Sequence, residues 1–171
     1  MAKPKRSKAL RVLGVDTSMS SPGFAVIEVI DRKPKVTALF HVKTDTKDNY
    51  AQRTQHIEYY SYAFFREQRP IDTIVRENFD SKNSKIEYSV FSSWSAVDRA
   101  LHHLGMRIEL DAMPPSEIKR LVTGRGKAEK WEVEEAVRRI TGYTGPFATN
   151  DESDACGIAL AYLLKEELID G

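Results

Sequence analysis

The chain has a single cysteine and no long apolar run. Cys156 alone cannot form an intramolecular disulfide framework or a zinc site built from cysteines. No stretch approaches the roughly 20 apolar residues that a membrane-spanning helix needs, so we expect no membrane partner. The basic N-terminus is not followed by an apolar segment, which argues against a signal peptide. The expected compartment is the reducing cytoplasm.

The chain also has almost no net charge, at +1 for 171 residues, so its overall charge does not indicate a nucleic-acid partner. The charge is unevenly distributed, however. Residues 1–11 carry five basic side chains and no acid. We interpret residues 1–9 as a flexible basic tail and residues 10–171 as one domain, in keeping with 41% hydrophobic and 30% charged residues. A second basic stretch surrounds a glycine loop and contains Lys119, Arg120, Arg125, Lys127 and Lys130.

The order of the predicted elements indicates an α/β fold. Short apolar runs separated by turns predict three strands that form an antiparallel meander, at residues 10–16, 24–29 and 36–42. Alternating helices and strands follow, at 49–68, 71–77, 84–104 and 106–110. Three more helices are predicted at 114–122, 129–140 and 150–168. This is the element order of the ribonuclease H-like fold, a mixed five-stranded sheet flanked by helices, with the fourth and fifth strands parallel.

Four acids lie at the ends of elements that this fold would bring together. Asp16 ends the first strand, Glu77 ends the fourth, and Asp151 and Asp154 begin the last helix. Taken singly, each has an ordinary explanation: a turn residue, a salt bridge with Arg76, or acids favoured by the helix dipole. In the predicted sheet the ends of the first and fourth strands lie side by side, so Asp16 and Glu77 become neighbours.

Converging carboxylates repel one another unless a cation lies between them, which indicates divalent metal and phosphate chemistry. Two-metal nucleases hold their ions roughly 3.5–4 Å apart, so that one activates water and the other stabilises the leaving oxygen. Hard oxygen ligands suit Mg²⁺, for which Mn²⁺ can substitute, and two ions need three or four carboxylates. The adjacent His102 and His103 point in different directions on a helix and are interpreted as surface and core residues.

Three segments resemble the motifs of RuvC-type Holliday junction resolvases, the crossover junction endodeoxyribonucleases. The first is Leu13-Gly14-Val15-Asp16 with the strand that follows at 23–27, and Glu77 falls where this family places its second acid. Residues 122–130 (VTGRGKAEK) resemble its Gly-x-Gly-x-Ala-x-Lys segment, and residues 151–155 (DESDA) resemble its Asp-x-x-Asp-Ala motif. The resemblance spans about residues 10–165, and the last two motifs together make it specific.

The resemblance implies an endonuclease that acts as a homodimer and cuts two strands of a four-way DNA junction with Mg²⁺, in a bacterial nucleoid or a phage-infected cell. It implies that Asp16, Glu77, Asp151 and Asp154 are metal ligands. Lys130 could also offset charge that builds on the cleaved phosphate. The residues implied to contact DNA are Lys119, Gly124, Arg125, Gly126, Lys127, Lys130 and Phe79.

Two departures from the family pattern indicate a divergent branch, such as a phage or prophage enzyme. Asp16-Thr17-Ser18 replaces the usual Asp-Pro-Gly, which changes the turn but keeps the acid. The family's junction-inserting aromatic follows its second acid by three residues, whereas Phe79 follows Glu77 by two. We assign this role to Phe79, with a buried loop aromatic as the alternative.

The predicted helix 84–104 has more apolar side chains than one small domain can cover. Its apolar stripe at three- and four-residue spacing consists of Ile86, Val90, Trp94, Val97, Leu101 and Leu104. Tyr88 and Phe91 also need partners, and the family implies a dimer interface that includes this helix. The alternative is that the stripe packs only on its own sheet.

Other functions remain open at this level. A different ribonuclease H-like nuclease, acting on RNA or other branched DNA, would share the acids but not the glycine-loop motif. An actin-like ATP-binding domain or sugar kinase would need a second phosphate-binding glycine motif and a longer chain. A module that binds branched DNA without cutting it would not need the complete set of acids.

Overall fold

The structure, a computed structural model, describes residues 9–79 and 84–170. The predicted basic tail at residues 1–9 lies outside the described residues except for Ala9.

Four strands form one mixed sheet in the order β3-β2-β1-β4. β1 (Leu10–Asp16), β2 (Gly23–Ile30) and β3 (Lys33–His41) make the predicted antiparallel meander. β4 (Thr73–Arg76) runs parallel to β1 on its other side. The two strands whose ends carry Asp16 and Glu77 are therefore hydrogen-bonded neighbours.

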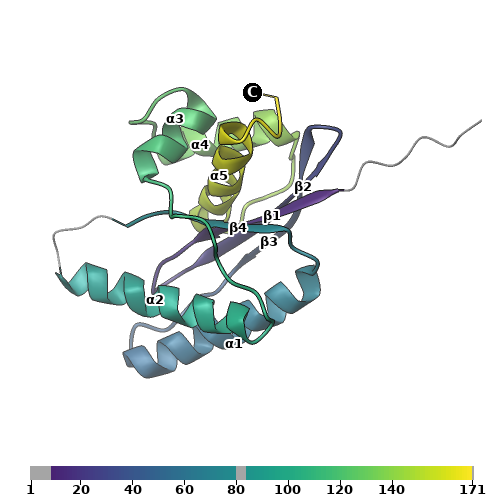
Figure 1. The fold of residues 1–171 in the computed structure, drawn as a ribbon. Coiled ribbons are helices and arrows are strands. Elements are labelled where there is room, and N and C mark those ends of the chain that lie inside the picture. Colours follow the sequence, from purple (N-terminus) through teal and green to yellow (C-terminus); the bar gives the residue numbers. More distant parts are fainter. Residues whose placement is uncertain (1–8, 80–83, 171) are drawn as a thin grey trace, which may run out of the picture.

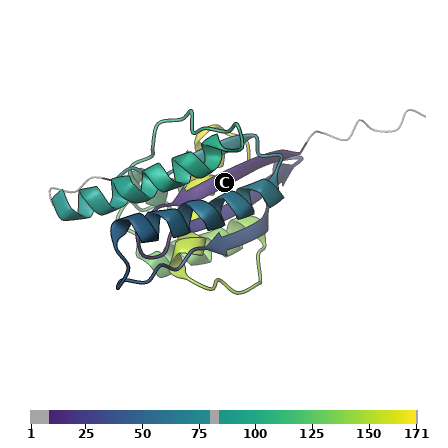
Figure 2. The same ribbon diagram turned by 90° about the horizontal axis from the view of Figure 1, so that it is seen from below.

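Helices cover both faces of the sheet (Figure 1). α1 (Tyr50–Gln68) and α2 (Ser84–His102) lie on one face, and Figure 2 shows them side by side. α3 (Pro115–Thr123), α4 (Lys130–Thr141) and α5 (Asn150–Lys165) lie on the other. The result is the three-layer α/β arrangement that the element order predicts.

β1 is buried on both sides because helices cover both faces of the sheet. Its successive side chains point to opposite faces and enter two different cores. Leu13 and Val15 join the core beneath α1 and α2, where they pack with Phe24, Phe65 and Leu101. Val12 points the other way, into the core that α5 shares with the sheet. The direction of each side chain at the end of β1 is fixed by this alternation.

The prediction of a fifth strand at residues 106–110 is wrong. In the described residues, the outer edge of β4 is met only by an isolated parallel bridge between Glu77 and Met113. Met113 donates its N–H to Arg76 O and accepts from Asn78 N, at 3.0 and 2.7 Å. Pro114 follows at once and has no N–H, so the pairing stops after one residue. The sheet has four strands, and the predicted fold class holds.

Smaller differences concern helix ends and faces. α5 ends at Lys165 instead of 168, and α2 at His102 instead of 104. Ile86, expected on the buried stripe of α2, is 45% exposed. Ile86 lies in the first turn of α2, ahead of the buried Val90. No helix of the described residues is both long and apolar enough to cross a membrane.

Candidate active site

The parallel pairing of β1 and β4 brings Asp16 and Glu77 to the same edge of the sheet. Val15 is in register with Arg76, and the two acids are the next residues on their chains. Val15 points toward α1 and α2, so Asp16 points toward the face that carries α5. Arg76 likewise turns toward α2, where it donates to Asp98 at 2.9 Å, and Glu77 therefore turns to the α5 face. The predicted neighbours share both an edge and a face.

Two glycines allow the first turns of α5 to pack closely against this edge. A Cβ at Gly14 of β1 would overlap the carbonyl oxygen of Ala155, and a Cβ at Gly23 of β2 would overlap that of Asp151. Only glycine allows the helix backbone to come this close to the strands. The sequence signal was a glycine inside the first apolar strand, at Gly14, and another at the start of the second, at Gly23.

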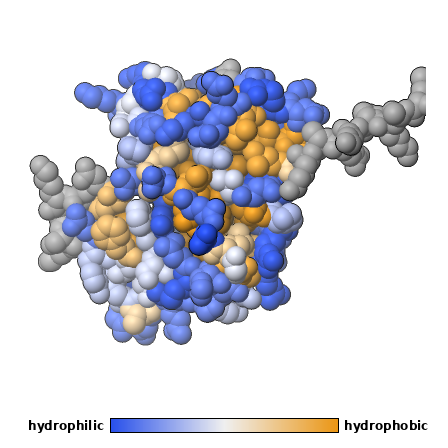
Figure 3. All heavy atoms as spheres, viewed as in Figure 1, coloured by the Kyte–Doolittle hydropathy of each residue, from blue (hydrophilic) through white to orange (hydrophobic). Residues whose placement is uncertain are grey.

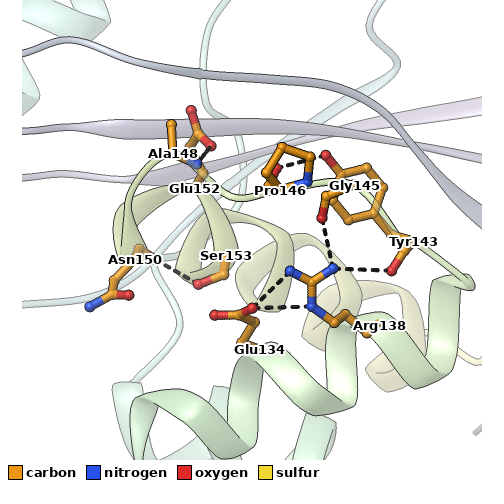
Figure 4. A network of polar contacts seen from close by, with 9 residues as sticks. All are labelled: Glu134, Arg138, Tyr143, Gly145, Pro146, Ala148, Asn150, Glu152 and Ser153. Carbon is orange, nitrogen blue, oxygen red and sulfur yellow. Dashed lines mark hydrogen bonds and ion pairs between the residues drawn. The ribbon is translucent and has the colours of Figure 1, made fainter.

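The loop before α5 is pinned by polar contacts (Figure 4). Arg138 of α4 donates to the carbonyl oxygens of Tyr143 and Gly145, at 3.3 and 2.7 Å, while Glu134 accepts from the same guanidinium. The loop therefore arrives at α5 along a fixed path, with Asp151 in the first helical turn.

Glu152 is a second anchor that the sequence reasoning missed. It is buried between the two candidate acids of α5, where Oε2 accepts from Ala148 N at 2.8 Å. Its Oε1 lies 2.8 Å from Nδ1 of His41, the last residue of β3. The start of α5 is thereby tied to a third strand. No sequence signal indicated this contact, because the burial of Glu152 becomes visible only in the folded chain.

The four acids interact electrostatically. Burial raises the pKa of Asp16 well above its ordinary value, and the charges of Glu77, Asp154 and Asp151 raise it further, against the attraction of Lys130. Burial, together with the charge of Asp154, raises the pKa of Glu77 to about 7. Burial also raises the pKa of Asp154, although Lys130 opposes this. The four acids therefore lie within electrostatic reach of one another.

Two lysines accompany the cluster. Lys130, the first residue of α4, donates from Nζ to Asp154 Oδ2 at 2.9 Å. Burial lowers the pKa of Lys130, but the hydrogen bond and the neighbouring acids outweigh it, and the net shift is upward. Lys119 of α3 favours the charged forms of Glu77 and Asp154. Both predicted phosphate contacts thus lie within electrostatic reach of the acids.

The glycine loop forms the turn between α3 and α4. Gly124 ends α3 with a φ of 83°, a left-handed conformation that favours glycine, and its N–H donates to Arg120 O. Arg125 is exposed and pairs with Glu132 at 2.7 Å, and Lys127 is exposed as well. At Gly126 a Cβ would lie 3.2 Å from Ser116 O, so this glycine keeps the loop close to α3.

The remaining predicted positions are less decisive. Phe79 is half-buried next to the undescribed residues 80–83, and its N–H donates to Asn78 Oδ1 at 2.9 Å. Ser18 stabilises the altered turn after Asp16. Its Oγ accepts a hydrogen bond from Ser21 N, and its carbonyl oxygen accepts one from Ser93 Oγ of α2.

The donor atoms of the cluster fit a divalent cation in kind, because all four acids supply the oxygen ligands that Mg²⁺ prefers. Two buried hydroxyls within two residues of Asp16 and Asp151 in the chain, on Thr17 and Thr149, lack a hydrogen-bond partner within the described residues. The distances between these acids, however, do not yet match those of a metal site. Among residues 9–79 and 84–170, no three Asp, Glu, His or Cys groups lie close enough to hold an ion as they stand. The acids are gathered, but they do not form a closed set of ligands.

Two cavities of the described residues lie away from the acids. One, of about 600 Å³, adjoins the amino end of β4 and is lined by Ile71, His102 and Met106 among others. The second, of about 550 Å³, lies between α2 and the segment before Met113. The acids sit instead at the open edge of the sheet, which suits a large substrate.

Comparison with known proteins gives a consistent result. A family model described as crossover junction endodeoxyribonuclease RuvC matches residues 12–162. The RuvC of Rickettsia bellii is 31% identical over 159 residues, which cover 91% of this chain and 98% of the relative. The RuvC of Salinispora arenicola is 27% identical over 157 residues, covering 91% and 89%.

Among solved structures, the chain resembles Thermus thermophilus RuvC in complex with a Holliday junction substrate. The TM-score is 0.81 and the identity 25%, and the match covers 92% of this chain and 94% of the other. The fold and nearly the whole length of the chain are thus shared with this protein.

Proposed function

The chain belongs to the RuvC family of crossover junction endodeoxyribonucleases, and on that premise we propose that Asp16, Glu77, Asp151 and Asp154 form its cutting centre. The protein is an endonuclease that resolves four-way DNA junctions. The assignment of these residues rests on one observation. Acids from three separate motifs converge on one edge of the sheet and shift one another's pKa values.

The proposed cofactor is Mg²⁺, two ions per site, with Mn²⁺ as a substitute. Nucleases of this family are metal-dependent, and the four carboxylates would hold the ions. When bound, such ions neutralise phosphate charge and lower the pKa of a nearby water. A bound cation would also offset the repulsion among the four carboxylates. This repulsion is poorly screened because Asp16 and Glu77 are largely buried, and its relief favours metal binding.

The chain's own lysines act on the DNA phosphate. The ammonium group of Lys130 already lies at Asp154. A DNA phosphate bound near the acids would therefore lie close to a positive charge without any rearrangement of the backbone. This placement lets Lys130 offset negative charge that develops during cleavage. Lys119, Arg125 and Lys127 extend the positive surface along the α3–α4 turn, where they would hold the DNA backbone.

We further propose that the enzyme is a homodimer joined through a surface that includes α2. Ile86, Tyr88 and Phe91 in its amino-terminal half are 45%, 60% and 52% exposed. In Figure 3 the surface over this end of α2 is mostly pale, and a small apolar patch lies just above it. A two-fold axis there would present two cutting centres to a junction of matching symmetry.

A single substrate panel tests the proposed function. Synthetic four-way junction, Y-fork, linear duplex and RNA–DNA hybrid are incubated with Mg²⁺ or with EDTA. We expect paired nicks in the four-way junction only, and only with the metal. Equal cleavage of the linear duplex or of the hybrid would contradict junction resolution, and cleavage in EDTA would contradict the metal-dependent centre.

A further inference from the structure

An exposed tryptophan directly follows a lysine of the candidate site in the chain. Trp131 is the second residue of α4 and is 66% exposed. It directly follows Lys130, whose ammonium contacts Asp154. Consecutive Cα atoms are about 3.8 Å apart, and adjacent helix residues point in different directions, so the indole begins beside Lys130 but faces another side of α4. The family motif that the sequence matches here contains no aromatic residue.

The fold does not need Trp131 for packing. α4 is held on the core by Val133, Ala136 and Val137. Within the part of the chain that the structure describes, no aromatic ring and no guanidinium stacks on Trp131. Trp94, the other tryptophan, is different: Arg76 lies 4.0 Å over its ring and Phe91 packs at its edge. Tryptophan is enriched at binding interfaces, where its ring is covered by a partner.

The surroundings of Trp131 favour a polyanion. Lys127 and Lys130 precede it in the chain and are exposed, with the exposed acid Glu129 between them. The neighbouring acid Glu132 is neutralised locally, because Oε1 pairs with Arg125 at 2.7 Å and Oε2 accepts from Glu129 N at 2.7 Å. Glu135 lies one helical turn further along, so the basic surface ends there. An aromatic ring among cations is the combination that binds exposed bases and their backbone.

We propose that Trp131 stacks on a base of the DNA strand next to the phosphate that is cut. The proposal deepens the junction-cleaving function and rests on it. At the exchange point of a four-way junction the continuous stacking of a duplex is interrupted, and an indole face there can replace the lost stacking partner. Phosphates along one strand recur about every 3.4 Å of helix axis, so a side chain beside Lys130 reaches a nucleotide adjacent to the cut.

The test uses the full chain, labelled four-way junction and EDTA, so that binding is measured without cleavage. Trp131→Ala should weaken junction binding roughly 5- to 100-fold, the range for loss of one base–aromatic stack. It should weaken binding to linear duplex much less, because duplex bases are already stacked. Trp131→Phe should restore most of the junction affinity.

Fluorescence gives an independent readout. Binding of junction should quench the emission of the unmodified protein, whereas Trp131→Phe, which keeps only Trp94, should lose most of the quenching. Tyr59→Ala is the matched control, since Tyr59 is 67% exposed on α1, across the sheet from α4. This control should bind and quench normally.

The outcomes separate this inference from the proposed function. Unchanged junction affinity in Trp131→Ala, equal loss on junction and duplex, or equal quenching in Trp131→Phe would each overturn base stacking. Junction cleavage by the unmodified protein would persist in all three cases. Absence of junction cleavage by the unmodified protein would instead overturn the function itself.

Discussion

Lys130 Nζ lies 2.9 Å from Asp154 Oδ2, which joins two motifs that are 24 residues apart in the chain. One partner comes from the end of the glycine loop and the other from the first turns of α5. This contact places the positive charge of the basic stretch at the acids that would carry out cleavage. It gives the glycine-loop motif a direct link to chemistry in addition to a role in holding DNA.

Neutralising the acids should separate cleavage from binding. We expect Asp16→Asn, Glu77→Gln or Asp154→Asn to abolish cleavage and leave junction affinity within a few-fold of normal, because each removes a proposed ligand but no phosphate contact. Gel-based cleavage and mobility-shift assays measure the two properties. Asp48→Asn, in an exposed loop, is the control. Parallel loss of binding and cleavage would count against the metal-site assignment.

Removing a basic side chain should flatten the salt dependence of binding. For Lys119→Ala or Lys130→Ala we expect slower cleavage and a log–log slope of affinity against salt that is smaller by roughly one unit per lost phosphate contact. Lys33→Ala is matched in charge but lies at the opposite end of the sheet and should change neither. Normal turnover together with an unchanged slope would remove both lysines from the site.

Stability without metal should fall as the pH rises. The native pKa of Glu77 is raised from 4.5 to about 7, so the folded protein binds more protons than the unfolded chain between these values. Over this window the free energy of unfolding should drop by at most about 3.5 kcal/mol, at about 1.4 kcal/mol per pKa unit. Asp16 and Asp154 shift in the same direction.

Urea unfolding in EDTA from pH 4.5 to 8 measures this effect. Glu77→Gln should give a flatter profile, and added Mg²⁺ should stabilise the unmodified protein most at the alkaline end. A stability that rises with pH across this window would show that the acids are not buried together.

The close packing of α5 on Gly14 and Gly23 should not tolerate a methyl group at either glycine. In Gly14→Ala the new Cβ meets the Ala155 carbonyl oxygen, and in Gly23→Ala it meets that of Asp151. We expect a loss of about 1–3 kcal/mol or more in the free energy of unfolding, because the backbone must shift. Since the shift displaces Asp151 and Asp154, cleavage should fall even in samples that remain folded. Denaturant melts and single-turnover cleavage check both effects, and unchanged values would contradict the close packing.

The proposed dimer is open to a direct measurement. Light scattering at micromolar concentration should report twice the chain mass, and Phe91→Glu should shift it toward one chain mass by placing a charge in an apolar contact. Tyr59→Glu, on α1, serves as the matched change. A strictly monomeric unmodified protein would remove the paired-cut mechanism.

Much of the fold follows from local patterns. β1 is a short apolar run because it is buried on both faces, and the meander follows from short turns between such runs. The acids were identified because each follows or begins an element with a clear boundary. The predicted fifth strand failed because pairing depends on a partner edge, and the edge of β4 is met only at Met113.

The residue types and their order along the chain were sufficient to identify the family, and to predict the acids and the glycine loop as parts of its site. Distances across the chain were not accessible in the same way, because they depend on how separate elements pack. The tertiary structure alone decided that Gly14 and Gly23 seat α5, that Glu152 ties it to His41, and that Lys130 reaches Asp154. It also decided which aromatic side chains lie open, since exposure depends on what the rest of the fold covers.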